Sequence, residues 1–306
     1  MDVEDTAALQ AATTTAQDLV EAELLPEALE RAIRDAYAAL GDGEDVEVAV
    51  RSSATGEDTS SASFAGMNET YLNVRGAAAV VDAVRRCWRS LFGSRTVYYR
   101  AKRGFGQADM DIAVVVQRQV ASTRAGVMFT VDPASGAADH LVIEGAFGLG
   151  ESVVSGSVSP DRYVVDKATL HILAREVRRK ELAIEARPDG GTITRELPAE
   201  EARRPVLDDR EVEAVASLGR RIEEHYGSPQ DTEWAFDPDG ALWMLQSRPI
   251  TSMGGDQARR LRAPSPAACS SRAWAPHPAR PEGRCACWRH STMRRASATT
   301  TSSSPT

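Results

Sequence analysis

Cysteine, lysine and long apolar runs are all scarce in this 306-residue chain. Cys87 is the only cysteine before residue 252, so no disulfide framework holds the body of the chain together. The most apolar run, residues 112–116, falls far short of the ~20 residues that a membrane-spanning helix needs. The first residues are acidic and lack the basic and apolar segments of a signal peptide. We therefore expect a cytoplasmic protein without a disulfide scaffold and without a membrane partner.

The net charge of −8 is divided unevenly along the chain. After residue 252, nine arginines oppose two acidic residues, so this segment carries +7 and residues 1–252 carry −15. Such an acidic body argues against a nucleic-acid partner bound through patches of Lys and Arg. It does not argue against a nucleotide held by a few well-placed cations.

Both ends of the chain lack a regular apolar pattern. Residues 1–15 are rich in Ala and Thr and predict a disordered N-terminus. Residues 253–306 consist mainly of Ala, Pro, Ser, Arg and Thr, and cannot bury enough apolar surface to offset their chain entropy. Only three of the 36 basic residues are Lys, which is typical of a GC-rich gene, and we hypothesise that this tail is translated in a shifted frame. A genuine disordered basic tail is the alternative.

Between these ends, residues 16–252 mix helical and strand patterns without regular alternation. Apolar residues spaced by threes and fours predict helices over residues 16–40, 77–92 and 208–226, with a further helix after Gly93. Shorter apolar or alternating segments predict strands at residues 46–51, 70–74, 112–120, 126–131, 141–145, 163–165 and 192–195, and a hairpin over 231–249. This irregular order is typical of an α+β fold.

The first segment that could carry chemistry is residues 48–58. A strand ends in Arg51 and opens into a loop rich in Ser, Thr and Gly. The guanidinium fork of Arg suits phosphate, and small residues let backbone N–H groups approach anionic oxygens. Taken alone, the same pattern fits a solvated loop after an edge strand equally well or better.

The second segment is the hairpin, whose turn is formed by Asp237, Pro238, Asp239 and Gly240. If the loop consists of Pro238 and Asp239, Glu233 faces Met244 and Asp231 faces Gln246. Side chains alternate between the faces of a strand, so this register divides the hairpin into two faces. The polar face carries Asp231, Glu233, Gln246 and Arg248, and the apolar face carries Trp234, Phe236, Trp243 and Leu245.

The polar face brings a carboxylate, an amide oxygen and a guanidinium close together. Oxygen ligands are what Mg²⁺ prefers, with phosphates and waters completing its shell. A neighbouring Arg fits the terminal phosphate of the same nucleotide. The alternative is a solvated sheet face with an ion pair, which contributes about 0–1 kcal/mol.

Several motifs in sequence order now resemble the N-terminal nucleotide-binding domain of the phosphoenolpyruvate synthase and pyruvate phosphate dikinase family, which also occurs in rifampicin phosphotransferase. They are VAVRSSATGED at residues 48–58, SFAGMNETYLN at 63–73, CWRSLF at 87–92, GVMFTVDP at 126–133, GLGE at 148–151 and QSRPIT at 246–251. The resemblance covers about residues 16–252. It implies an ATP-grasp fold, in which two α+β lobes clasp ATP.

The resemblance also implies roles for individual residues. Arg51 and Arg248 would contact the phosphates as the catalytic cations, and Glu233 and Gln246 would hold Mg²⁺. The remaining ATP-binding positions would be Gly66 and Thr70 in and after the loop, and Gln117, where the strand between the lobes meets the adenine.

The chain departs from the family in two ways. No Gly-Gly-Lys segment precedes residue 46, so we expect the domain to be incomplete at its N-terminus. The domain with the phosphate-carrying His and the pyruvate domain are also not recognisable. We therefore expect the ATP-binding part of a dikinase that phosphorylates a His and then pyruvate, releasing AMP and phosphate, and we expect the isolated chain to be inactive. The alternatives are the ATP domain of an antibiotic phosphotransferase, with an antibiotic-binding domain as partner, and a non-catalytic nucleotide-binding fragment or pseudogene product.

Overall fold

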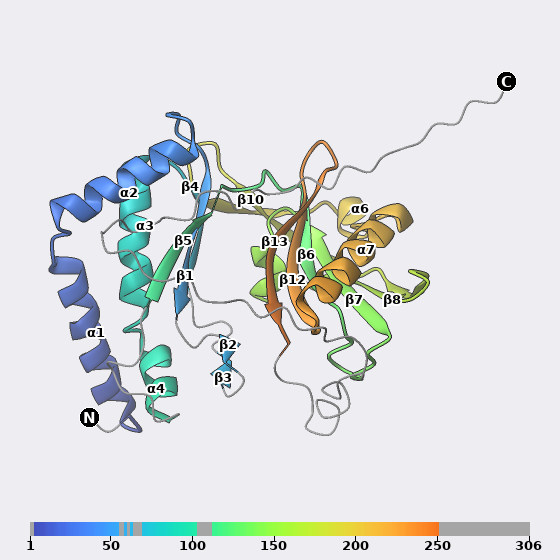
Figure 1. The fold of residues 1–306 in the computed structure, drawn as a ribbon, viewed down its shortest axis with the longest axis horizontal. Coiled ribbons are helices and arrows are strands. Elements are labelled where there is room, and N and C mark those ends of the chain that lie inside the picture. Colours follow the sequence, from blue (N-terminus) through green and yellow to red (C-terminus); the bar gives the residue numbers. More distant parts are fainter. Residues whose placement is uncertain (1–2, 55–57, 60–61, 64–68, 103–111, 251–306) are drawn as a thin grey trace, which may run out of the picture.

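Two β-sheets face each other across the middle of the molecule, and each is covered by helices on its outer side (Figure 1). The computed structural model describes residues 3–54, 58–59, 62–63, 69–102 and 112–250. We call the part built on residues 3–118 the first lobe and the part built on residues 124–250 the second lobe. The mixture of helices and sheets confirms the predicted α+β class.

The first lobe has a three-stranded antiparallel sheet in the order β4-β1-β5. These strands are β1 (Val48–Ala54), β4 (Thr70–Val74) and β5 (Ile112–Arg118). The helices α2 (Glu27–Leu40) and α3 (Ala77–Ser90) pack on the outer face of the sheet. Val48 and Val50 are fully buried there with Val80, Val84 and Cys87, which leaves the alternate positions of β1 facing the other lobe.

The N-terminal region corrects two expectations. Residues 6–15 are not disordered, because α1 (Thr6–Ala22) begins at an N-cap, Asp5, whose carboxylate accepts from the N–H groups of Ala7 and Ala8 at 3.0 Å. Thr13 is buried and its hydroxyl lies 2.7 Å from that of Ser94, which opens α4 (Ser94–Lys102). The single helix predicted over 16–40 is interrupted between the end of α1 at Ala22 and the start of α2 at Glu27. Pro26 lies in this interruption, and proline disfavours a helical conformation of the residue before it.

The second lobe has a six-stranded antiparallel sheet in the order β13-β12-β6-β7-β8-β9. Its strands are β6 (Arg124–Phe129), β7 (His140–Phe147), β8 (Asp161–Asp166), β9 (Ile172–Glu176), β12 (Gln230–Phe236) and β13 (Leu242–Pro249). The long helix α7 (Asp209–Tyr226) covers the outer face and is started by a capping box of Asp208 and Glu211. At Gly219 the helix comes so close to the sheet that a Cβ would lie 2.4 Å from the Cε atom of Met128.

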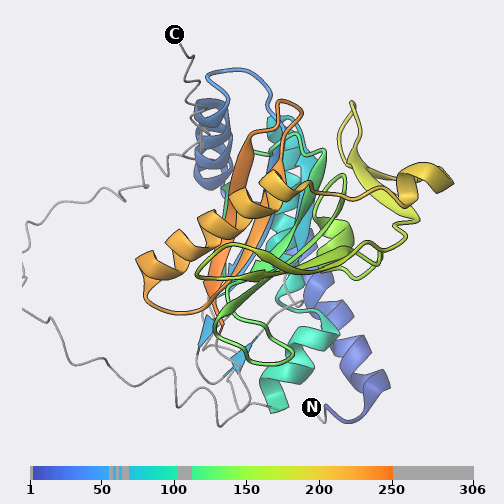
Figure 2. The same ribbon diagram turned by 90° about the vertical axis from the view of Figure 1, so that its right-hand side faces the viewer.

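Four short elements and a hairpin complete the described chain. The short elements are β2 (Asp58–Thr59), β3 (Ala62–Ser63), α5 (Glu151–Val154) and α6 (Ala199–Ala202). The hairpin consists of β10 (Leu182–Ala186) and β11 (Thr192–Glu196), and it projects beyond the main sheet of the second lobe (Figure 2). Within the described residues, no helix is both long and apolar enough to cross a membrane.

Sequence patterns located most of these elements. The strand at 70–74, the helices at 77–92, after Gly93 and at 208–226, and the strand at 192–195 are all present within a residue or two. Strands β9 and β10 were not predicted, and four of the five residues of β9 are exposed, so no apolar alternation marks it. The predicted tail over 253–306 lies outside the described residues, so the proposed domain boundaries stay predictions.

Candidate functional site

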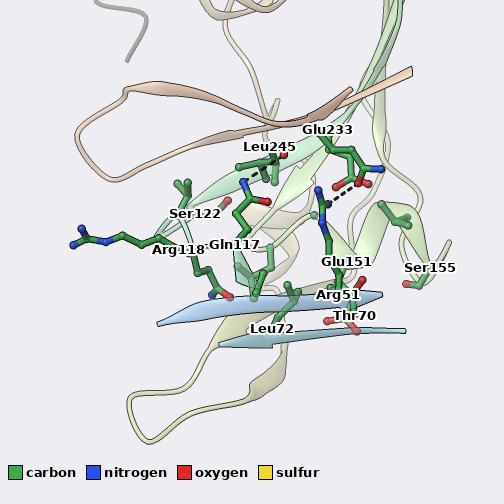
Figure 3. A pocket seen from close by; sticks show the side chains of 18 residues that line it. Arg51, Thr70, Leu72, Gln117, Arg118, Ser122, Glu151, Ser155, Glu233 and Leu245 are labelled. Atoms are coloured by element: carbon green, nitrogen blue, oxygen red, sulfur yellow. Dashed lines mark hydrogen bonds between the residues drawn. The ribbon is translucent and has the colours of Figure 1, made fainter. Parts of the chain in front are cut away.

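A cavity of about 380 Å³ lies between the two lobes (Figure 3). Its first-lobe wall is formed by β1, β4 and the end of β5, and its second-lobe wall by β12, β13 and the segment around α5. A volume of a few hundred Å³ is typical of sites for small molecules and cofactors.

The first-lobe wall follows from the alternation of β1. Val48 and Val50 point into the core, so Ala49 and Arg51 point the other way and line the cavity. Thr70 lines it from the neighbouring strand, where it is paired with Arg51. The guanidinium of Arg51 reaches across the cavity, and its Nη1 donates to Oε1 of Gln246 at 2.6 Å (Figure 3).

The hairpin of the second-lobe wall has a different register from the predicted one. Its loop is one residue longer, because Asp237 N–H bonds to the carbonyl of Ala241 and Gly240 adopts a φ of +77°. A bulge at Leu245 then shifts the pairing by one more residue, so Glu233 lies opposite Gln246 and Asp231 opposite Arg248. The two shifts together preserve the predicted polar face and place its members directly across from each other.

The predicted apolar face is confirmed for Trp234 and Phe236 and wrong for Trp243 and Leu245. Trp234 pairs with Met244 and Phe236 with Leu242, and all four belong to or pack against the buried core of the second lobe. Trp243 lies opposite Ala235 instead and its Nε1 donates to the carboxylate of Asp237 at 2.8 Å. Leu245 lines the cavity rather than the core. The single-residue shift before the bulge moves these two side chains to the other face.

Glu233 lines the cavity from β12. None of the residues described by the structure donates a hydrogen bond to its carboxylate, although Gln246 lies opposite it. Burial raises the pKa of Glu233 above its ordinary range, while the nearby charges of Arg51 and Arg248 oppose this shift. A half-buried carboxylate to which no described residue donates, beside an amide oxygen, is a donor set that fits Mg²⁺. No group of three or more His, Cys, Asp or Glu side chains that could hold a metal occurs in the described part of the chain.

Arg248 does not line the cavity within the described residues, in contrast to Arg51. Its Nε donates to Oδ2 of Asp231 at 3.0 Å, and both side chains are mostly buried. Asp231 was placed on the polar face by the sequence but was given no role there. In the structure its carboxylate fixes the orientation of the Arg248 guanidinium next to Glu233.

The end of the cavity around Gln117 and Leu245 has more apolar side chains, although Arg118 and Ser122 lie there as well (Figure 3). Leu72, Val120 and Leu149 add apolar lining, and the Nε2 of Gln117 donates to the carbonyl of Leu245 at 3.4 Å. Apolar walls with one fixed amide suit a flat heteroaromatic ring. The cavity therefore has an apolar end and a charged end, as a nucleotide does.

One predicted site residue remains, and two residues that were not predicted also line the cavity. Gly66 lies outside the described residues, so its role stays a prediction. Glu151 and Ser155 line the cavity from α5 and the residue after it, and neither was predicted as a site residue (Figure 3). The GLGE motif at 148–151 was the signal that could have pointed to Glu151, because a turn that ends in a carboxylate faces the opening between the lobes.

Comparison with known protein families shows to which family the chain belongs. Residues 1–266 match the family model described as pyruvate phosphate dikinase, AMP/ATP-binding domain. The chain belongs to this family. The dikinase-family chain is 50% identical over 257 residues to a protein of Methanothermobacter thermautotrophicus named "Probable phosphoenolpyruvate synthase", a match covering 83% of this chain and 37% of that protein.

A second relative of this dikinase-family chain carries a different name. A rifampicin phosphotransferase of a Streptomyces species is 44% identical over 256 residues, covering 83% of this chain and 29% of that protein. The chain thus spans about a third of the length of these relatives. Among solved structures, D-cycloserine synthetase matches 76% of this chain and 61% of its own at 15% identity, with a TM-score of 0.29, which carries no argument about the fold.

Proposed function

We propose that this chain binds ATP between its two lobes in an ATP-grasp arrangement, as the nucleotide-binding part of a phosphoenolpyruvate synthase-like dikinase. The observation that carries the proposal is the convergence of Arg51, from the first lobe, with Glu233 and Gln246, from the second lobe, on one cavity. Membership of a family described as an AMP/ATP-binding domain supports it.

The geometry suggests how the parts of ATP are distributed. The adenine would lie at the apolar end beside Gln117, with Thr70 and Gly66 closer to the phosphates. The guanidinium groups of Arg51 and Arg248 would neutralise the phosphates from opposite lobes. Glu233 and Gln246 would hold Mg²⁺, which would supply further neutralisation of the phosphate charge.

The contribution of the chain to phosphoryl transfer would then be positioning and charge neutralisation. Arg51 would hold the phosphates against the first lobe, and Arg248, oriented by Asp231, would approach the transferring phosphate from the second. The walls of the cavity would exclude water from the apolar end. In the complete enzyme we expect the phosphoryl group to pass to a His of a partner domain and then to pyruvate, with AMP and phosphate released in the cytoplasm.

Transfer to an antibiotic is the second candidate. The 44% identity to a rifampicin phosphotransferase supports it, and the acceptor-binding part of either enzyme would lie beyond the matched region. A nucleotide-binding module without catalytic activity is the third.

Calorimetric titration of the purified full chain tests ATP binding. We expect ATP to bind more tightly with Mg²⁺ than without it, and AMP and adenosine to bind more weakly because they lack the β- and γ-phosphates. Incubation with ATP and Mg²⁺ should release little AMP unless a His-carrying acceptor domain is added. Failure to bind ATP at millimolar concentration would refute the proposal, and robust AMP release by the chain alone would refute the need for an acceptor domain.

A further inference from the structure

The hairpin β10–β11 bridges the two lobes. Its root belongs to the second lobe, because Ala183 and Leu197 are buried in the core of that lobe and the carbonyl of Ile184 accepts from Leu149 N–H at 2.7 Å. Its tip, residues 187–191, reaches the first lobe at the end of β4. In Figure 1, β10 accordingly lies between the strands of the first lobe and those of the second.

Within the described residues, every hydrogen bond from the first lobe to this tip is made by Asn73. Its Nδ2 donates to the carbonyls of Arg187 and Gly191, both at 2.7 Å, and its own carbonyl accepts from Gly191 N–H at 2.8 Å. The side chain is buried, with 1% of the residue exposed. One residue thus ties both ends of the turn between β10 and β11.

The backbone of Asn73 explains why this position carries an asparagine. Its φ is +54°, a left-handed conformation that Gly, Asn and Asp adopt most readily. Of these three, only Asn has an NH₂ group that can donate two hydrogen bonds. The carbonyls of Arg187 and Gly191 need two donors, and the backbone needs a residue that adopts a left-handed conformation. Asn meets both requirements.

The same residue is connected to the cavity walls. Its N–H donates to Oε1 of Gln119 at 2.6 Å, and Gln119 lines the cavity next to Gln117. On the first-lobe side, Thr70 and Leu72 of the same strand line the cavity. Across the cavity, the hairpin holds Leu149, another lining residue, through its bond to Ile184.

We propose that Asn73 is a positioning residue of the cavity, which clasps the hairpin and so fixes the first-lobe wall relative to the second. This inference rests on the proposed function only for the identity of the ligand. The clasp itself consists of contacts within the protein and does not depend on a ligand. Arg51 and Gln246 join the lobes at the charged end, and Asn73 joins them through the hairpin.

Hydrogen–deuterium exchange of the full chain tests the clasp without a ligand. Asn73→Gly and Asn73→Asp both suit the left-handed backbone but lose the NH₂ donors, and Asp42→Gly is the matched control. Asp42 has a φ of +53° and is exposed, and it makes no hydrogen bond to the described part of the second lobe.

We expect both Asn73 variants to raise exchange at residues 187–191 by about 10- to 30-fold, the change expected for two lost hydrogen bonds. Exchange in the wall segments 117–123 and 148–151 should rise as well, while α7 stays as protected as in the wild type. Asp42→Gly should change none of these segments. If Asn73→Gly and Asn73→Asp exchange like the wild type, Asn73 serves only the backbone conformation and the proposal is wrong. Loss of protection in α7 as well would show a general structural role and would equally overturn it.

A nucleotide titration adds an independent readout. A displaced wall should weaken ATP and adenosine by the same factor in both Asn73 variants, about 3- to 10-fold, since positioning affects the base end as well as the phosphates. A loss confined to ATP would contradict positioning. If the wild type binds no nucleotide, the proposed function fails, whereas exchange still decides whether Asn73 acts as a clasp.

Discussion

Two polar clusters of the second lobe, one fully buried and one half-buried, differ in how completely their groups are paired. One contains Lys180 and Asp161, both fully buried, and the other contains Glu233 and Gln246 at the cavity. Both place charge where water is scarce, which is costly unless the charge finds partners. The comparison separates a cluster that holds the fold together from one that has room for a ligand.

In the Lys180 cluster, the buried charged groups have hydrogen-bond and ionic partners within the protein. The ammonium group donates to Oδ1 of Asp161 at 2.6 Å and to the carbonyl of Arg204 at 2.8 Å, and it lies 5.6 Å from the centre of the Phe147 ring. Asp161 accepts further bonds from the N–H groups of Arg178 and Val206. These contacts tie the root of the β10–β11 hairpin to the main sheet.

The Glu233 cluster is open. Its carboxylate accepts no hydrogen bond from the residues described, and burial raises its pKa. Glu233 lines a cavity that also holds the Arg51 guanidinium. The fully paired charges of Lys180 and Asp161 therefore stabilise the fold, whereas a half-buried carboxylate that accepts no hydrogen bond from the described residues is available to a ligand.

Removing Lys180 should have the largest effect. Lys180→Met leaves the Asp161 carboxylate buried without its counter-charge, and we expect a loss of about 3–5 kcal/mol in the free energy of unfolding. Urea unfolding followed by circular dichroism measures it. The double variant Lys180→Met with Asp161→Asn should recover part of the loss, and a purely additive double variant would contradict the coupling of the pair.

Neighbouring positions of β12 should respond in opposite ways. Trp234→Ala empties a fully buried indole site against Gly145 and should cost about 3–5 kcal/mol. Glu233→Ala should leave the unfolding free energy almost unchanged but weaken Mg²⁺-dependent ATP binding, as should Gln246→Ala. Urea titration and calorimetry of the same preparations give both quantities. Equal destabilisation by Trp234→Ala and Glu233→Ala would mean that the two faces are assigned wrongly.

Arg51 and Arg248 should contribute to the affinity for the phosphates of ATP and not to the affinity for its adenine base. A charge-assisted contact to phosphate contributes about 1.5–3 kcal/mol, so Arg51→Ala and Arg248→Ala should each weaken ATP about 10- to 100-fold. Lys at either position keeps the charge but not the fork and should recover only part of the affinity. Calorimetric titration with ATP and adenosine separates the effects, and an equal loss for both ligands would assign these arginines to the fold.

The smallest effect concerns the ionisation of Glu233. Its pKa is raised in the folded state, so the folded protein binds this proton more tightly than the unfolded chain and the ionised group costs stability at pH 7. Glu233→Gln should therefore slightly stabilise the protein at pH 7. This gain should shrink as the pH falls through the raised pKa toward the ordinary value of 4.5. Thermal unfolding between pH 4 and 8 measures the difference from wild type, and a gain that grows on acidification would contradict the sign.

Local patterns predicted the site better than they predicted its surroundings. Glu233 and Gln246 could be placed on one face because the alternation of side chains along a strand is a local property. The longer loop and the bulge together shift the pairing by two residues, and a shift of two returns each side chain to the face that was predicted. Trp243 was placed on the wrong face because only the first of these shifts acts on it. The clasp at Asn73 joins residues 118 positions apart, and no periodicity in the sequence reports such a contact.

The bulge at Leu245 leaves one residue of β13 that the sheet does not need for pairing. Trp234 would still oppose Met244, and Glu233 would still oppose Gln246, in a chain one residue shorter at this point. Deletion of Leu245 would remove its apolar side chain from the cavity wall and the carbonyl that accepts the hydrogen bond of Gln117. Length variation at this position could thus reshape the apolar end of the cavity during evolution while the charged end keeps its register.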